Sequence, residues 1–134
     1  MKVETHLSFE GRCEEALTYY QQQLNIQVSM LMRFADSPDP SLCPPGADDK
    51  IMHANFKLGE TAFMASDGTC SGETSFEGFA LSFNADSEAE GHRIFTAFAE
   101  EGTVGKPLHT SFWGGLYGEV TDKFGLTWMI SVLS

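Results

Sequence analysis

The feature that most constrains the fold is a short sequence that occurs twice. Residues 57–64 read KLGETAFM and residues 123–130 read KFGLTWMI, so each copy has Lys, an apolar residue, Gly, any residue and Thr before an apolar run. Leu-Ser-Phe also occurs twice, at 7–9 and at 81–83, in the same order along the chain. Internal repetition indicates duplicated structural units. We therefore expect two copies of one unit that begins with a strand and a helix and ends with a glycine turn and a strand.

The first half changes from the two-residue period of a strand to the wider period of a helix and back. Strands are predicted at 3–9, 27–34, 50–58 and 61–66, with a helix at 13–24. In the second predicted strand, alternation puts these apolar residues on one face: Val28, Met30, Met32 and Phe34. Residues 36–49 hold four prolines and four aspartates, a composition that predicts an irregular exposed loop.

The second half repeats this order. A strand is predicted at 78–85, and Ser87 and Glu90 have the spacing of a capping box at the start of a helix that ends near Gly102. Three strands are predicted in the remaining sequence, at 103–112, 116–122 and 126–133. The order βαβββ, given twice, predicts an α+β fold. We expect one domain, 1–134, made of modules 1–66 and 76–134 and a linker, 67–75.

Charge and apolar content exclude several classes of partner. The formal net charge is −11, whereas nucleic acid and anionic membranes are bound by surfaces rich in Lys and Arg. No apolar run approaches the roughly 18 residues of a membrane span, and the first residues lack the apolar core of a signal peptide. Three cysteines, none in a CxxC pair, fit reduced thiols. We expect a cytoplasmic protein with no nucleic-acid or membrane partner.

Four stretches resemble a known superfamily. They are LSFEGRCEEALTYY at 7–20, DKIMHANFKLGETAFMASDG at 49–68, GFALSF at 78–83 and FWGGLYGEVTDKFGLTWMI at 112–130. The sequence is similar to the PhnB-like branch of the vicinal-oxygen-chelate superfamily, which contains glyoxalases, extradiol dioxygenases and bleomycin-resistance proteins. This branch is often described as a demethylubiquinone methyltransferase. The resemblance implies that the two modules form a curved, half-open mixed β-barrel with the helices outside.

The metal site implied by the resemblance is largely missing. Metal-dependent members place His or Glu on the first strand of each module and Glu near the last strand of each. His6 is close to the first position, but residues 78–80, Gly-Phe-Ala, offer no ligand at the second. The strand 61–66 has no carboxylate, and Met129 stands where the resemblance implies Glu. We therefore expect no metal and no cofactor. His6 is left with two interpretations, a polar cavity wall or a structural histidine with satisfied hydrogen bonds.

Aromatic and sulfur-containing side chains are the alternative lining of a cavity, although such residues on strands usually belong to the core. SFWGGLYGE at 111–119 places three aromatics among three glycines, and glycine lets a backbone approach a ligand closely. The candidate ligand-binding residues are His6, Met64, Phe79, Phe112, Trp113, Tyr117, Glu119 and Met129. Trp128 is a further candidate for the lining.

Other chemistry has little support in the sequence. Cys13 falls on the apolar helix stripe beside Glu14 and Glu15, which disfavours a nucleophilic thiolate. No GxSxG, Walker A or strand-GxGxxG-helix motif occurs, so a methyltransferase cofactor site has no support.

Two functions remain. The first is metal-free binding of a small, partly apolar or aromatic molecule in the cavity between the modules, which favours a binding protein over an enzyme. The alternative is a glyoxalase-type metal-dependent lyase or dioxygenase that uses His6, Glu119 and an ion. A half-open barrel leaves strand edges and an apolar mouth exposed, so we also expect a homodimer, as the resemblance implies.

Chelation tests the expected absence of a metal. We predict that EDTA leaves the melting temperature of protein purified without chelator unchanged. A divalent ion bound only to the folded state would add about 2.7 kcal/mol of stability at a hundredfold excess over its dissociation constant, and EDTA would remove it. A lower melting temperature in EDTA, restored by adding one divalent metal, would contradict the expectation.

Overall fold

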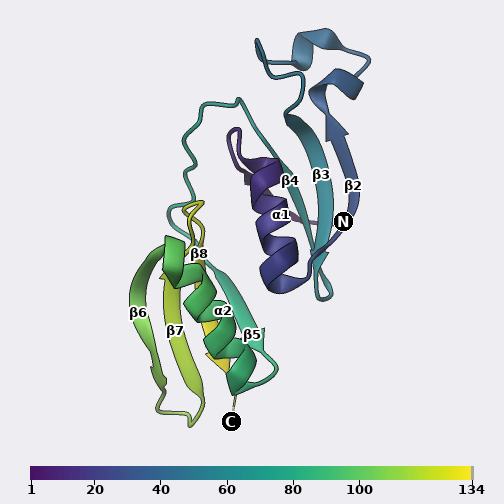
Figure 1. The fold of residues 1–134 in the computed structure, drawn as a ribbon. Helices are drawn as coiled ribbons and strands as arrows, with labels where there is room; N and C mark the ends of the chain where they lie inside the picture. The colour runs from purple at the N-terminus through teal and green to yellow at the C-terminus, as the bar shows by residue number, and fades with distance from the viewer. Residues whose placement is uncertain (134) are drawn as a thin grey trace. The chain divides into compact units, whose positions relative to one another are not determined.

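The computed structural model describes residues 1–133, which fold into two compact units, 1–74 and 75–133. Each unit contains one helix and a sheet of four strands, in the chain order βαβββ. In each unit the helix lies across one face of its own sheet (Figure 1). No helix in the described part of the chain is long and apolar enough to cross a membrane.

The first unit is built on a sheet with the strand order β1-β4-β3-β2. Its elements are β1 (Thr5–Ser8), α1 (Cys13–Leu24), β2 (Gln27–Arg33), β3 (Ile51–Leu58) and β4 (Thr61–Ser66). β1 is parallel to β4, and the other two pairs are antiparallel. The expected irregular loop between β2 and β3 contains two short 3-10 helices, Phe34–Asp36 and Pro40–Leu42.

The second unit repeats this topology with the strand order β5-β8-β7-β6. Its elements are β5 (Leu81–Ala85), α2 (Glu88–Glu101), β6 (Thr103–Thr110), β7 (Leu116–Thr121) and β8 (Thr127–Val132). β5 is again parallel to β8, and the other pairs are antiparallel. The predicted α+β fold with two βαβββ modules is therefore confirmed. The repeated Leu-Ser-Phe begins in the first strand of each module, at Leu7 and Leu81.

The helices and the facing sides of the sheets form the buried core of each unit. On α1 the predicted stripe is buried at Cys13, Ala16, Leu17 and Tyr20, and the ring of Tyr20 packs 6.1 Å from that of Phe9. On α2 the buried residues are Gly91, Ile94, Phe95 and Phe98. Trp128 of β8 lies beneath α2, with its ring 5.3 Å from that of Phe98. Each sheet therefore has one face covered by its helix.

The two helices begin differently. The Ser87 side chain caps α2 by accepting a 3.1 Å hydrogen bond from the Glu90 N–H, and Glu90 in turn accepts from the Asp86 N–H at 3.0 Å. The predicted cap is therefore present, with Glu90 bonded one residue earlier than in a capping box. At α1 the flanking Arg12 makes no side-chain cap bond. The Cys13 N–H instead donates to Asp67, just after β4, at 2.7 Å.

The repeated Lys-x-Gly-x-Thr sequences occupy corresponding but unequal hairpins. Gly59 and Gly125 both lie in the left-handed region, with φ of 60° and 88°, which glycine adopts without strain. In the first hairpin Leu58 pairs with Thr61 around a two-residue turn, whereas in the second Thr121 pairs with Thr127 around a longer loop, 122–126. Aligning the glycines would superpose buried Phe63 on half-buried Met129, so the copies differ in register.

The longer loop is organised by the buried carboxylate of Asp122. Its Oδ1 accepts the N–H groups of Phe124 and Leu126 at 2.9 and 3.1 Å. Its Oδ2 accepts the indole N–H of Trp128 at 2.9 Å. Asp122 is only 3% exposed, so these donors have no access to water as a substitute partner.

One predicted strand face is wrong. A register shift between Val28 and Met30 changes the side on which the following residues lie. Val28 pairs with buried Phe56 on the helix-covered face, whereas Met30 pairs with Asn55 on the opposite face. A β-bulge adds one residue to one strand, so alternation cannot continue through it. Phe34 lies beyond the strand, in the first 3-10 helix.

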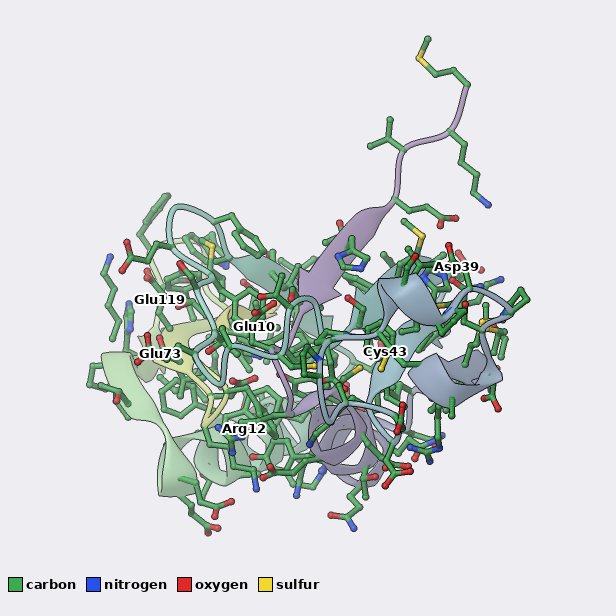
Figure 2. The ribbon with its side chains drawn as sticks, turned by 90° about the horizontal axis from the view of Figure 1, so that it is seen from above. Glu10, Arg12, Asp39, Cys43, Glu73 and Glu119 are labelled. Carbon is green, nitrogen blue, oxygen red and sulfur yellow. The ribbon has the colours of Figure 1, made fainter. Side chains whose placement is uncertain are left out.

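The segment after β4 is bound to the first unit through two carboxylates. Asp67 Oδ1 accepts the N–H groups of Gly11 and Cys13, and Oδ2 accepts that of Ile51 at 2.7 Å. Glu10, labelled in Figure 2, accepts hydrogen bonds from Ser8, from the Thr69 hydroxyl and from the Ser71 N–H. The hydrogen bond from Ser8 is the main cause of the fall in the pKa of Glu10 to about 2. Asp67, Thr69 and Ser71, which lie where the sequence predicts a linker at 67–75, therefore form hydrogen bonds within the first unit.

We predict that Asp122→Ala lowers the free energy of unfolding by about 3 kcal/mol, because three buried N–H groups lose their acceptor. Urea unfolding followed by far-UV circular dichroism measures the loss. The matched control is Asp86→Ala, since Asp86 is exposed and its backbone N–H, which bonds Glu90, is retained. Equal stabilities of the two variants would show that the Asp122 carboxylate contributes no net stabilisation.

Candidate functional site

The face of the second sheet opposite α2 carries two rows of polar side chains. Residues that pair directly across strands point to the same side of a sheet. One row crosses all four strands and contains Ser82, Met129, Glu119 and Lys106. The next row contains Asn84, Ser131, Tyr117 and His109. We call this surface the open face of the second unit.

A pocket of about 530 Å³ lies at the end of the open face where β6 and β7 meet. Pockets of roughly 300–1,000 Å³ commonly hold small molecules. The lining residues within the described part of the chain are Lys106, His109, Thr110, Ser111, Phe112, Trp113, Tyr117 and Met129. All eight belong to the second unit. We call this the aromatic pocket.

The β6–β7 loop presents two aromatic side chains from a fixed base. Ser111 N–H and Oγ both donate to the Gly115 carbonyl, at 2.7 and 2.9 Å, and the Gly114 N–H donates to the Ser111 carbonyl at 3.1 Å. A Cβ at Gly115 would lie 1.9 Å from the Val132 carbonyl oxygen, so only glycine fits against the end of β8. At the tip of this loop, Phe112 is 98% exposed and Trp113 43% exposed. The anchored base therefore positions rings that remain accessible.

The aromatic rings pack edge to face in a continuous series. The Phe112 and Trp113 centroids are 5.0 Å apart at 82°, and those of Trp113 and Tyr117 are 5.9 Å apart at 70°. His109 follows, 6.2 Å from Tyr117 at 86°. Edge-to-face packing of this kind is the preferred geometry of aromatic pairs. In such a pair the edge of one ring meets one face of the other, so that contact leaves at least one face of each ring uncovered.

Polar groups lie beside the rings. The Tyr117 hydroxyl donates to Glu119 Oε2 at 2.9 Å, and Lys106 Nζ is 3.5 Å from the same oxygen. Partial burial raises the pKa of Tyr117, and the Glu119 carboxylate raises it further, so this phenol stays protonated at neutral pH. His109 Nδ1 bonds the Pro107 carbonyl at 2.9 Å and must carry the proton, because a carbonyl can only accept. Figure 2 labels Glu119, which comes from β7.

The aromatic pocket brings together four of the residues proposed from sequence, namely Phe112, Trp113, Tyr117 and Met129. Glu119 lies beside it through its contacts with Tyr117 and Lys106. Phe79 lies before β5, where its ring packs 6.3 Å from that of Phe76. Trp128 points to the helix-covered face and is 3% exposed, so it belongs to the core.

Sequence reasoning did not identify Lys106, His109, Thr110 and Ser111 as pocket residues. Register shifts on both sides of Lys106 interrupt the alternation of β6, so their face could not be read from the pattern. Their position in the sequence could have identified them, because Lys106 and His109 lie shortly before the aromatic loop.

His6 and Met64 are placed in the first unit, on the sheet face opposite α1, where they pair across β1 and β4. Partial burial lowers the pKa of His6, and His53 lowers it further. His53 Nε2 lies 2.9 Å from Asn55 Oδ1 and donates to it. The His6 ring is exposed and beside a thioether, which fits a polar surface position in this unit.

One residue position compared with the superfamily's metal ligands, the first-strand position of the second module, differs from the position expected from sequence. β5 begins at Leu81, so residues 78–80 precede the strand, and the residue paired with Met129 is Ser82. In the first unit His6 of β1 pairs with Met64 of β4. Among residues 1–133, no group of three or more His, Cys, Asp or Glu side chains is arranged to hold a metal ion. Cys13 is fully buried, and burial raises the pKa of its thiol, as expected for a core residue.

Comparison with known proteins identifies the family. Residues 1–131 match the family model described as 3-demethylubiquinone-9 3-methyltransferase. Protein YjdN of Escherichia coli K12 is 35% identical over 141 residues, covering 99% of this chain and 96% of that protein. The chain belongs to this family.

Solved structures agree with this assignment. Protein PA1353 of Pseudomonas aeruginosa is 38% identical with a TM-score of 0.85, over 99% of this chain and 98% of that one. A PhnB protein of Bacillus cereus is 26% identical with a TM-score of 0.82, over 98% and 99%. A glyoxalase/bleomycin resistance/dioxygenase family enzyme of Burkholderia phytofirmans, 15% identical with a TM-score of 0.62 over 98% and 96%, shares the fold alone. The predicted resemblance to the PhnB-like branch of the glyoxalase superfamily is confirmed.

Proposed function

We propose that this PhnB-like protein binds a small, partly apolar or aromatic molecule without a metal ion, and that the aromatic pocket is the binding site. The observation that carries the proposal is the edge-to-face series Phe112–Trp113–Tyr117, whose first two rings are exposed on an anchored loop and whose third lies on β7. Exposed aromatic rings are unfavourable in water, and stacking on a flat molecule would cover them. The sequence predicts a ligand in a cavity between the modules. The aromatic pocket, in contrast, is lined by residues of the second unit.

The strand positions that the superfamily uses for metal support the metal-free part of the proposal. On β4 and β8 the side chains in register with the first strands are Met64 and Met129. Thioethers suit soft ions, whereas Mg²⁺, Mn²⁺ and Zn²⁺ prefer oxygen, imidazole or thiolate ligands. A divalent lyase or dioxygenase centre would therefore need ligands from other positions.

The methyltransferase description of the family is not needed for this proposal. Glycine-rich loops that bind nucleotide cofactors lie between a strand and the start of a helix. Here Gly114 and Gly115 connect two antiparallel strands, β6 and β7. The glycines serve the tight hairpin and its contact with Val132.

We further propose that the protein is a homodimer. Both sheets are open, so β1, β2, β5 and β6 each have an unpaired edge within the described residues. Leu31 on β2 and Val104 on β6 are 39% and 43% exposed. Exposed strand edges with apolar side chains favour pairing with another chain. A solved structure of the dimer would also show whether the two chains exchange modules.

Binding is tested with 2-naphthol, a neutral flat probe, by NMR of the two tryptophan indole N–H groups. We expect the Trp113 signal to shift and that of Trp128, buried and bonded to Asp122, to stay in place. Trp113→Ala lacks the reporter indole, so its affinity is measured by calorimetric titration; binding should be about three- to tenfold weaker, the value of a lost aromatic contact. Leu42→Ala, which truncates an exposed apolar side chain in the first unit, and added EDTA should leave the affinity unchanged. A probe that binds equally to Trp113→Ala would disprove the assigned site.

Assembly is tested by light scattering over a dilution series at micromolar concentration. We expect twice the 14.7 kDa mass of one chain, with a buried area above roughly 1,000 Å² in the solved dimer. A mass of one chain at every concentration would refute the dimer.

A further inference from the structure

The charges of the aromatic pocket differ from those of the whole protein. The chain has a formal net charge of −11. Yet among the eight lining residues within the described part of the chain, Lys106 carries a fixed positive charge and none is Asp or Glu. A pocket that only had to attract flat apolar molecules would not require a cation, so the position of Lys106 carries information about the ligand.

The Lys106 ammonium has donors left for a ligand. It lies 3.5 Å from Glu119 Oε2, beyond the usual 2.7–3.2 Å of a hydrogen bond. That same oxygen already accepts the Tyr117 hydroxyl at 2.9 Å. The Lys106 side chain is 64% exposed, so its flexible stem can turn toward a bound molecule at little cost. Glu119 therefore holds the cation near the pocket without using all of its hydrogen-bonding capacity.

His109 offers a second polar contact on the same strand. Because Nδ1 donates to the Pro107 carbonyl, Nε2 is the ring atom left for a ligand. Neutral His109 would accept a ligand hydroxyl through Nε2, and protonated His109 would donate to a ligand anion. With its proton on Nδ1, the neutral ring cannot donate to a carboxylate through Nε2, so the carboxylate contact is assigned to Lys106.

We propose that the ligand of the aromatic pocket is a planar aromatic carboxylate. Its ring stacks against Trp113 and Tyr117, and its carboxylate accepts from Lys106. The inference rests on the proposed binding function and adds the charge of the ligand to it. A cationic aromatic molecule would meet Lys106 unfavourably, and a neutral one would leave the ammonium unused.

Three matched probes separate this inference from the binding function itself. They are 2-naphthoate, its neutral amide 2-naphthamide and the cation 2-naphthylmethylammonium, each titrated while the Trp113 indole signal is followed. We expect 2-naphthoate to bind about two- to fivefold more tightly than the amide, the value of a partly exposed charge contact, and the cation to bind most weakly. Equal affinities of all three would overturn the proposed charge selectivity while the binding function stands. No shift of Trp113 with any probe would overturn both.

Charge variants identify the group responsible. Lys106→Gln should remove the preference for 2-naphthoate over 2-naphthamide. Lys57→Gln changes the net charge equally at an exposed position in the first unit and should keep the preference. Glu119→Gln should strengthen 2-naphthoate binding, because Lys106 loses its competing carboxylate. The unchanged Trp128 signal reports that each variant is folded. A preference for 2-naphthoate that survives in Lys106→Gln would overturn the proposal.

Discussion

The buried carboxylate of Asp122 determines where the polar face of the second sheet lies. By accepting three N–H groups it fixes the loop between β7 and β8, and that loop sets which residues of the two strands are paired. Side chains alternate along a strand, so a slip of one residue would exchange the two faces. If β7 slipped by one residue against its neighbours, Glu119 would turn toward α2 and buried Val120 toward solvent. The aromatic pocket exists because this one register is held.

Rigid and accessible parts are separated along the β6–β7 hairpin. Its base is tied by Ser111 and by the contact of Gly115 with the end of β8, whereas its tip carries Phe112 and Trp113 in contact with solvent. An anchored loop loses little conformational freedom on binding, which keeps the entropic cost of recognition low. The sheet supplies Tyr117, Glu119 and Lys106 from two neighbouring strands, so the polar contacts are also held by backbone pairing.

Regular periodicity and the resemblance together predicted most of the fold. The bounds of α1 and β4 agree with the predicted ranges, because an uninterrupted stripe and a glycine turn define them. The face of β2 was mispredicted because a bulge at Ser29 leaves no mark on the pattern of apolar residues. The aromatic half of the candidate site follows from its unusual glycine-rich composition. The positions of Lys106 and His109 in the site could not be predicted from the sequence, because Pro107 and two register shifts hide which face of β6 these residues occupy.

The different starts of the two helices have a consequence for the order of folding. Ser87 and Glu90 satisfy the first turn of α2 from within a few residues, so that helix can begin to form before any distant contact exists. The first amide of α1 depends on Asp67, which reaches it only after the chain has travelled through β2, β3 and β4. Closing so long a loop is entropically costly and slow. Two copies of one topology should therefore mature at different times, with the second helix formed early and the first completed by the arrival of its own last strand.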